Sequence, residues 1–156
     1  HLVGAAASCE QETPRERTGV VQPAGRGPAV GAAEDARRAV DIGADAIMVS
    51  NHGGRQLDGA IAAADAVPAI HAALQGRATL IMDSGVRRGV DALTAKALGA
   101  NAVGIGRAAL FGACAGGEQG AHRAIEILID ELRRAMQLSG VADFSSAQVD
   151  LKQTSA

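Results

Sequence analysis

The chain of 156 residues is long enough for one ordinary domain but shorter than the ~250 residues of a typical (β/α)8 barrel. Its hydrophobic content of 47% and charged content of 21% are those of a globular protein, and its net charge of -2 gives no reason to expect nucleic acid or an anionic membrane surface as a partner. Aromatic residues make up 1%, with no Tyr or Trp, so the core must be aliphatic and no aromatic platform exists for stacking bases.

The two cysteines, Cys9 and Cys114, lie far apart in the sequence and lack the spacing of metal ligands. We therefore expect free thiols, no bound metal and a reducing compartment, the cytoplasm. No apolar run approaches the ~20 residues of a membrane span. The opening residues have no basic flank and begin without Met, so we do not interpret them as a signal peptide.

The first predicted elements follow a change in composition. Residues 1–31 are rich in Gly, Pro, Arg and Glu with little apolar periodicity, and we expect them to be mostly irregular. From Ala32 onward, good helix formers with acids before bases predict a helix that ends at Gly43. The continuous apolar run 46–49 then predicts a strand that is buried on both faces and extends to Ser50.

The same pattern then repeats. A helix is predicted over 62–74, with Pro68 as an awkward feature that kinks or restarts it, and a strand over 79–82. A helix over 91–98 and a third strand over 102–105 follow. This alternation requires an α/β fold with a parallel sheet and right-handed crossovers, either a piece of a barrel or an open doubly wound sheet.

The final predicted helix, 118–138, has the clearest pattern in the sequence. Its apolar residues recur at helical spacing, with acids and arginines on the opposite face. We expect this apolar stripe to pack in the core. It consists of Ile125, Leu128, Ile129, Leu132 and Met136.

The segment Ser50–Asp58 carries the strongest chemical signal, because it should emerge at the carboxyl end of a buried parallel strand. His52 can take a proton near neutral pH, and Arg55 can grip a carboxylate with two hydrogen bonds. Gly53 and Gly54 let a ligand approach the backbone. A base beside an anion clamp predicts chemistry on an acid. The alternative is a tight loop whose histidine only caps neighbouring backbone groups.

Two further strand ends also deliver a glycine and an arginine. Gly85 with Arg87 follows the second strand, and Gly106 with Arg107 follows the third. Free backbone N–H groups, helix starts and guanidinium groups together predict a phosphate cradle. The alternative is a tight turn with a solvated Arg87. Asp83, at a strand end, either hydrogen-bonds a ligand hydroxyl or caps the next helix.

The segment 104–109 also fits the loose dinucleotide pattern G-x-G-x-x-A. A nicotinamide site would want an acid at the end of a second strand about 20 residues later. That region is instead predicted to be the helix around Glu126. The dinucleotide interpretation is therefore the weaker one.

These motifs together resemble the FMN-dependent 2-hydroxy-acid oxidase and dehydrogenase family, which includes glycolate oxidase, flavin-type lactate dehydrogenase and mandelate dehydrogenase. The matching text is Ser-Asn-His-Gly-Gly-Arg-Gln-Leu-Asp at 50–58, Asp-Ser-Gly-Val-Arg-Arg-Gly-Val-Asp at 83–91, Ala-Leu-Gly-Ala at 97–100, Ile-Gly-Arg at 105–107 and Gly-Gly-Glu at 116–118. The resemblance implies that 32–156 form the C-terminal part of a (β/α)8 TIM barrel, about strands six to eight, and that the barrel is incomplete.

The resemblance also implies a function. The cofactor would be FMN, and a small 2-hydroxy acid such as lactate, glycolate or mandelate would be oxidised to the 2-oxo acid. His52 would be the catalytic base and Arg55 the clamp on the substrate carboxylate, while Ser50 would face the flavin ring. The residues implied in cofactor binding are Ser50, Asp83, Ser84, Gly85, Val86, Arg87, Gly106 and Arg107.

Departures from the family pattern keep alternatives open. The family's lysine at the end of the fifth strand has no counterpart in the corresponding stretch 26–30, its substrate-binding tyrosines are missing, and 1–31 do not resemble it. We therefore expect a fragment of the full enzyme that self-associates or is complemented by the missing N-terminal half. The alternatives are an inactive remnant that binds flavin, phosphate or nothing, and another barrel that binds FMN or a sugar phosphate.

Overall fold

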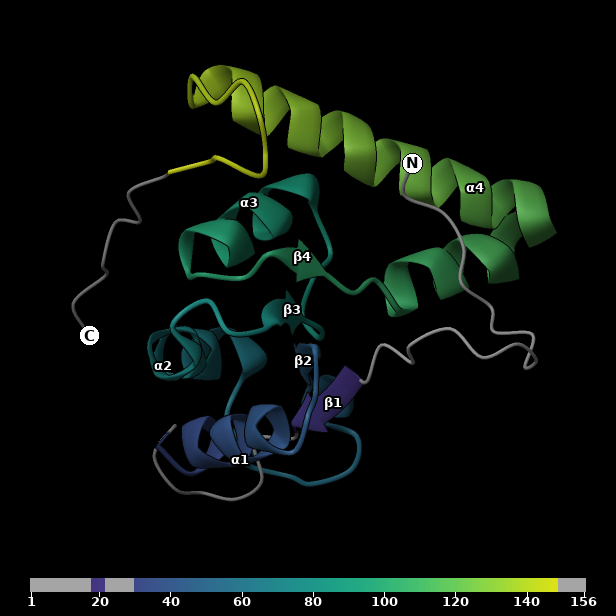
Figure 1. Cartoon of the computed structure of the whole chain (residues 1–156). Helices are drawn as coiled ribbons and strands as arrows, with labels where there is room; N and C mark the ends of the chain where they lie inside the picture. Colours follow the sequence, from purple (N-terminus) through teal and green to yellow (C-terminus); the bar gives the residue numbers. More distant parts are fainter. Residues whose placement is uncertain (1–17, 22–29, 149–156) are drawn as a thin grey trace, which may run out of the picture.

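The computed structural model describes residues 18–21 and 30–148. In this part of the chain, four parallel strands form one sheet in the order β1-β2-β3-β4, with a helix between each pair of successive strands (Figure 1). The predicted α/β class with a parallel sheet is confirmed. The elements are β1 Thr18–Val21, α1 Val30–Asp41, β2 Ala46–Val49, the short 3-10 helix η1 His52–Gly54, α2 Ala63–Leu74, β3 Thr79–Met82, α3 Gly89–Ala97, β4 Ala102–Val103 and α4 Arg107–Leu138.

The strand register brings the carboxyl ends of the strands to one level. Ala46 lies opposite Thr79 and Val49 opposite Met82, while Val103 of β4 also lies opposite Met82. Because parallel strands end on the same edge of a sheet, the loops that follow β2, β3 and β4 open side by side. The predicted site segments are therefore neighbours in space although they are distant in sequence.

The core is aliphatic, as the composition requires. Ile47 of β2 and Leu80 of β3 pack against Ile70 and Leu74 of α2, and each of these four side chains is at most 1% exposed. Burying one such side chain stabilises the fold by roughly 1.5–3 kcal/mol. Pro68 does not interrupt α2, which continues without a break to Leu74.

Strand β1 lies within the segment 1–31, which we expected to be mostly irregular. Thr18–Val21 pairs in parallel with β2, with Thr18 opposite Ala46 and Val21 opposite Val49. A four-residue edge strand is defined by a non-local partner, so its own sequence shows little periodicity. The remainder of the segment, 1–17 and 22–29, lies outside the described residues.

Helix α4 begins earlier than predicted and contains a kink. The predicted portion 118–138 is helical, but another arm, 107–115, precedes it, and the two meet where Gly116 and Gly117 leave the helical conformation. The arms fold back on each other at two other glycines. A Cβ atom built on Gly112 would lie 2.4 Å from the carbonyl oxygen of Gly120, so only glycine allows this backbone contact. This glycine-rich sequence gave no helical signal before Glu118.

The apolar stripe of α4 is less buried than we expected. Leu128 is buried, whereas Ile125 is 40% and Ile129 is 42% exposed; Leu132 and Met136 are half-buried. The physical reason is that α4 packs mainly against α3 and does not join the main aliphatic core. The prediction of core packing was therefore wrong: Leu128 is buried, but the stripe lies outside the main aliphatic core.

The contact between α3 and α4 depends on Gly89. A Cβ atom there would lie 2.0 Å from the backbone nitrogen of Leu132, so the helices approach backbone to backbone. The N–H of Gly89 donates to Glu131 Oε2 at 2.9 Å, which satisfies one of the unpaired N–H groups at the start of α3.

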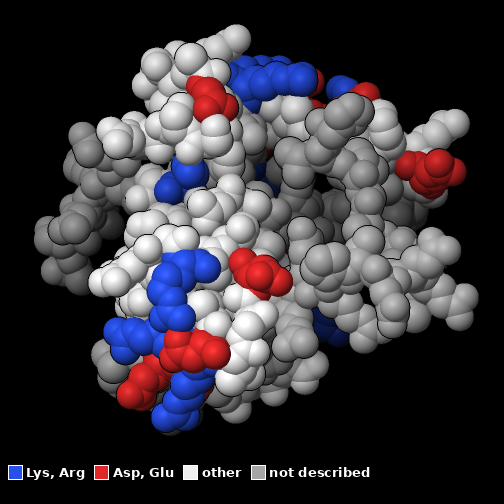
Figure 2. Space-filling view, viewed as in Figure 1, with Lys and Arg blue, Asp and Glu red and all other residues white. Residues whose placement is uncertain are grey.

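The charged side chains on the face shown in Figure 2 are mixed in sign. Basic and acidic groups lie close together at the lower left, and groups of both signs also occur at the top and across the middle of this view. Among the described residues, Arg77 and Asp41 form an ion pair, 2.5 Å apart and about half exposed, and such pairs contribute ~0–1 kcal/mol. Within 18–21 and 30–148, no helix combines the length and apolar character needed to span a membrane.

Candidate active site

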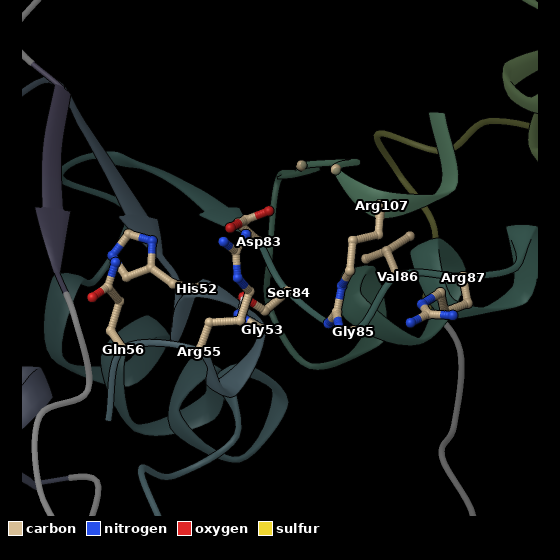
Figure 3. A pocket seen from close by; sticks show the side chains of 12 residues that line it. His52, Gly53, Arg55, Gln56, Asp83, Ser84, Gly85, Val86, Arg87 and Arg107 are labelled. Carbon is tan, nitrogen blue, oxygen red and sulfur yellow. Dashed lines mark hydrogen bonds between the residues drawn. The ribbon is translucent and has the colours of Figure 1, made fainter. Parts of the chain in front are cut away.

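A cavity of about 230 Å³ opens at the carboxyl ends of the strands, between the loops that follow β2, β3 and β4 (Figure 3). All of the residues predicted for the site line this cavity except Ser50. The lining residues are His52, Gly53, Arg55, Gln56, Asp83, Ser84, Gly85, Val86, Arg87, Gly104, Gly106 and Arg107. In Figure 3, His52 and Gln56 lie at one end and Arg87 at the other, with Asp83 and Arg107 between them. Three sequence motifs therefore form one site.

Ser50 lies beneath the cavity and supports it. Its side chain is 2% exposed, and its Oγ donates to Asp83 Oδ2 at 2.5 Å. The same oxygen accepts the N–H of His52 at 3.1 Å. A buried hydroxyl with these partners links the β2 loop to the β3 loop, because it satisfies a carboxylate on one and a backbone donor on the other.

Asp83 faces the cavity and does not cap the next helix. The cap of α3 comes from Asp91, whose Oδ2 accepts the N–H groups of Arg87 and Arg88, each at 2.8 Å. The alternative capping role for Asp83 was therefore wrong. Its carboxylate lies against Gly104, where an added Cβ would come 3.0 Å from Oδ1.

The His52 turn has an uncommon backbone conformation. His52, Gly53 and Gly54 have φ angles of 53°, 69° and 75°. A positive φ is uncommon for a residue with a side chain, and it persists where the surroundings fix it. Here Asn51 Oδ1 accepts the N–H of Gly53 at 3.0 Å, and the carbonyl of Asn51 accepts the N–H of Gly54 at 3.0 Å. The side chain and the backbone carbonyl of Asn51 thus cap this turn and place His52 at the cavity.

The charge of the site favours an anion. Arg55, Arg87 and Arg107 line the cavity, and Asp83 is the acidic residue among the lining side chains. Arg107 reaches from the start of α4 to the His52 turn, since a Cβ built on Gly53 would lie 2.6 Å from its Nη2. Guanidinium groups grouped in this way suit a phosphate or a carboxylate.

Two glycines leave room for a ligand beside the backbone. Cβ atoms built on Gly85 and Gly106 would meet nothing within 4 Å. Gly106 also directly precedes α4, whose first N–H groups lack partners within the helix. At the far end of the cavity, the guanidinium of Arg87 lies 5.7 Å from the ring centroid of Phe111, a cation–π distance that helps to hold this arginine in place.

Sequence reasoning assigned no role to two of the lining residues, Gln56 and Gly104. Gln56 belongs to the segment 50–58, and its position four residues after His52 could have indicated that it also lines the cavity. Gly104 appeared only as part of the dinucleotide pattern. That pattern lacks its second strand, because α4 occupies the region after β4 up to Leu138.

Comparisons with known proteins identify the family of this chain. A family model described as FMN-dependent dehydrogenase matches residues 29–154. An L-lactate oxidase of Nostoc sp. is 55% identical over 107 residues, which is 69% of this chain and 29% of that protein. A 4-hydroxymandelate oxidase of Amycolatopsis orientalis is 47% identical over 117 residues, 75% of this chain and 33% of that protein.

Solved structures give the same result. A crystal structure of mandelate oxidase with benzoyl-formic acid superposes with a TM-score of 0.70 at 45% identity, covering 78% of this chain and 35% of that one. The chain thus spans about a third of the length of the relatives it matches. Because the family model covers most of the sequence, the chain belongs to the FMN-dependent dehydrogenase family, as its motifs predicted, and FMN is the cofactor of that family.

Proposed function

We propose that this chain carries the base, the carboxylate clamp and the phosphate cradle of an enzyme that oxidises a small 2-hydroxy acid to the 2-oxo acid with FMN. One observation carries the proposal: a single cavity unites His52 and Arg55 of one loop with Arg87 and Arg107 of the next two. An acid substrate needs an anion clamp beside the base, and a cofactor with a phosphate needs a second cationic region.

The chemistry of the cradle fits FMN. We assign the phosphate to Arg87 and Arg107, with Gly85 and Gly106 allowing close approach to backbone N–H groups. Val86 is 6% exposed and packs in the core, so its contribution to cofactor binding would come from its backbone.

Three polar residues complete the proposed cofactor site. Asp83 and Ser84 line the cavity and offer hydrogen bonds to the ribityl hydroxyl groups. Ser50 would act from beneath, by fixing Asp83 through the 2.5 Å hydrogen bond.

The residues of the His52 loop would act directly on the substrate. Arg55 binds the carboxylate with two hydrogen bonds and so presents C2 and its hydroxyl group to His52. The C2–H and O–H bonds break, a C2=O double bond forms, and His52 takes one proton. Bound FMN supplies the acceptor for the two electrons and the remaining proton.

We also propose that 32–156 correspond to the C-terminal part of a (β/α)8 barrel, with β2, β3 and β4 as strands six to eight. The strand order is sequential, and α1, α2 and α3 lie on the same side of the sheet (Figure 1). A doubly wound sheet would reverse its order at a switch point and place helices on both faces. Strand β1 would take the place of strand five, although it precedes the matched residues 29–154.

The surroundings of the chain are also part of the proposal. The thiol of Cys114 is free and exposed, which suits a reducing compartment, and we propose the cytoplasm. We propose that a second copy, or the N-terminal half of the same barrel, covers the open edges of the sheet.

A titration with FMN tests the proposed function. The chain should bind FMN, and lactate, glycolate or mandelate should bleach the flavin absorbance without oxygen. His52→Ala should bind FMN as before but lose the bleaching. His122→Ala is the matched control, because His122 lies on α4, away from the cavity, with a side chain 74% exposed. A chain that binds no FMN contradicts the proposal.

A second candidate is a cradle that binds flavin or phosphate without turnover. The sequence favours it in one respect, since neither β1, the proposed strand five, nor the stretch 26–30 contains the lysine that the family resemblance implies. FMN binding without bleaching by any of the three acids would select this candidate.

A further inference from the structure

Ser84 has a backbone conformation that its side chain does not favour. Its φ is 83°, and among the described residues only His52 and Gln75 share a positive φ without being glycine. Such a conformation costs roughly 1 kcal/mol or more and persists where other contacts hold it. Two of these three residues belong to the cavity, and their loops are in direct contact.

The contacts of Ser84 form a continuous chain of hydrogen bonds. Ser84 Oγ accepts the N–H of Gly53 at 3.2 Å and lies 3.3 Å from Ser50 Oγ. Ser50 has a single hydroxyl hydrogen, which it donates to Asp83 Oδ2. The hydroxyl of Ser84 must therefore donate to Ser50 Oγ. The chain runs from Gly53 through Ser84 and Ser50 to the carboxylate of Asp83, and each bond in such a chain polarises the next.

We propose that Ser84 is a positioning residue for His52. Its hydroxyl joins the loop after β3 to the turn that carries the base and thereby holds the backbone from which the imidazole projects. This role rests on the proposed function, in which His52 takes the substrate proton. It also explains why a serine with a positive φ occupies a position that glycine would adopt without strain.

Two variants separate the hydroxyl from the backbone strain. Ser84→Ala removes the hydroxyl and keeps a side chain at a positive φ, whereas Ser84→Gly removes both. Gln75→Gly is the matched control, because Gln75 has a φ of 51° at the exposed end of α2, away from the cavity. Because glycine relieves the strain of a positive φ, Gln75→Gly should unfold at a higher denaturant concentration than the wild type. For the same reason, Ser84→Gly should be more stable than Ser84→Ala.

The decisive measurement is hydrogen exchange at the amide of Gly53, followed by NMR on the whole chain. The N–H of Gly53 donates both to Ser84 Oγ and to Asn51 Oδ1, the latter at 3.0 Å, and both Ser84 variants remove the first of these bonds. We therefore expect its exchange rate to rise by about threefold or more in both variants. The ring resonances of His52 should shift in the same variants. The amide of Asp83, bonded to the carbonyl of Val49 at 2.8 Å, should exchange as before, and Gln75→Gly should change none of these signals.

A wild-type exchange rate at Gly53 in either Ser84 variant would overturn the proposal. Faster exchange at the Gly53 amide in Ser84→Gly, at a stability equal to or higher than that of the wild type, supports the proposal. If the role of Ser84 were purely structural, faster exchange would be accompanied by a loss of stability. The measurement needs neither FMN nor substrate. A wild-type chain that fails to bind FMN would therefore contradict the proposed function and leave the test of Ser84 intact.

Discussion

The guanidinium of Arg107 lies against the backbone of Gly53, so that a methyl group on Gly53 would come within 2.6 Å of Nη2. These residues belong to loops that follow β4 and β2, and β3 lies between those strands. The contact therefore joins the proposed phosphate cradle to the turn that carries His52.

Gly53→Ala should weaken both the fold and the cradle. The new methyl group meets Arg107, and alanine at a φ of 69° is strained by about 1–2 kcal/mol. Gly54→Ala is the matched control, because Gly54 has a φ of 75° but an added Cβ meets nothing within 4 Å. We expect similar losses of stability from strain in denaturant unfolding, with a loss of FMN affinity confined to Gly53→Ala. Equal FMN affinity in the two variants would contradict the role of this contact.

Arg107→Ala should lower FMN affinity through the phosphate group. A hydrogen bond to a charged group contributes roughly 1.5–3 kcal/mol, so the dissociation constant should rise by about tenfold to a hundredfold. Riboflavin, which has no phosphate, should bind to the variant and to the wild type alike. Arg123→Ala on the exposed side of α4 is the control for lost charge. A parallel loss of riboflavin binding would assign Arg107 to the ring or the ribityl chain instead.

Gly89→Ala should loosen α4 from α3. Its methyl group would overlap the backbone at Leu132, and overpacking of this kind destabilises by about 1–3 kcal/mol or more. Gly116→Ala serves as control, because an added Cβ at this position meets nothing within 4 Å. Urea unfolding of the two variants measures the difference, and an unchanged midpoint for Gly89→Ala would show that the helices are not packed this closely.

The 156-residue chain, studied alone, should associate as its concentration rises. Leu110 and Phe111 on the first arm of α4 are 57% and 55% exposed, beside Ile105 at 39%. Apolar side chains grouped in this way, near the open edge at β4, favour contacts between chains. Sedimentation at increasing concentration should report larger species, and Leu110→Glu should reduce them. A monomer at all concentrations, with a single unfolding transition independent of concentration, would contradict this prediction.

The parts of the fold that the sequence predicted best are those with strong local patterns. The bounds of β3 coincide with the predicted run 79–82, because a buried parallel strand is apolar along its whole length. Strand β1 and the first arm of α4 were not predicted. Strand β1 depends on pairing with β2. The first arm of α4 contains Gly112, which is required for close packing against Gly120.

The candidate site shows the same division. Glycine and arginine at three strand ends were sufficient to predict which segments meet, because parallel strands end on one edge. The link from Ser50 to Asp83 spans 33 residues, and Ser84 bonds to Gly53 across 31. No local pattern encodes such bonds, since they exist only after the sheet has fixed its register.

Because the strands end at one level, selection for stability and selection for the shape of the cavity act on different residues. Register and burial depend on the apolar residues of β2 and β3 and on α2 behind them, whereas the cavity is formed by side chains of the loops beyond the strands. Substitutions in those loops can change the shape of the cavity while the aliphatic framework keeps its packing. The same scaffold can therefore acquire a preference for a different ligand through a few loop changes, without having to refold around each new one.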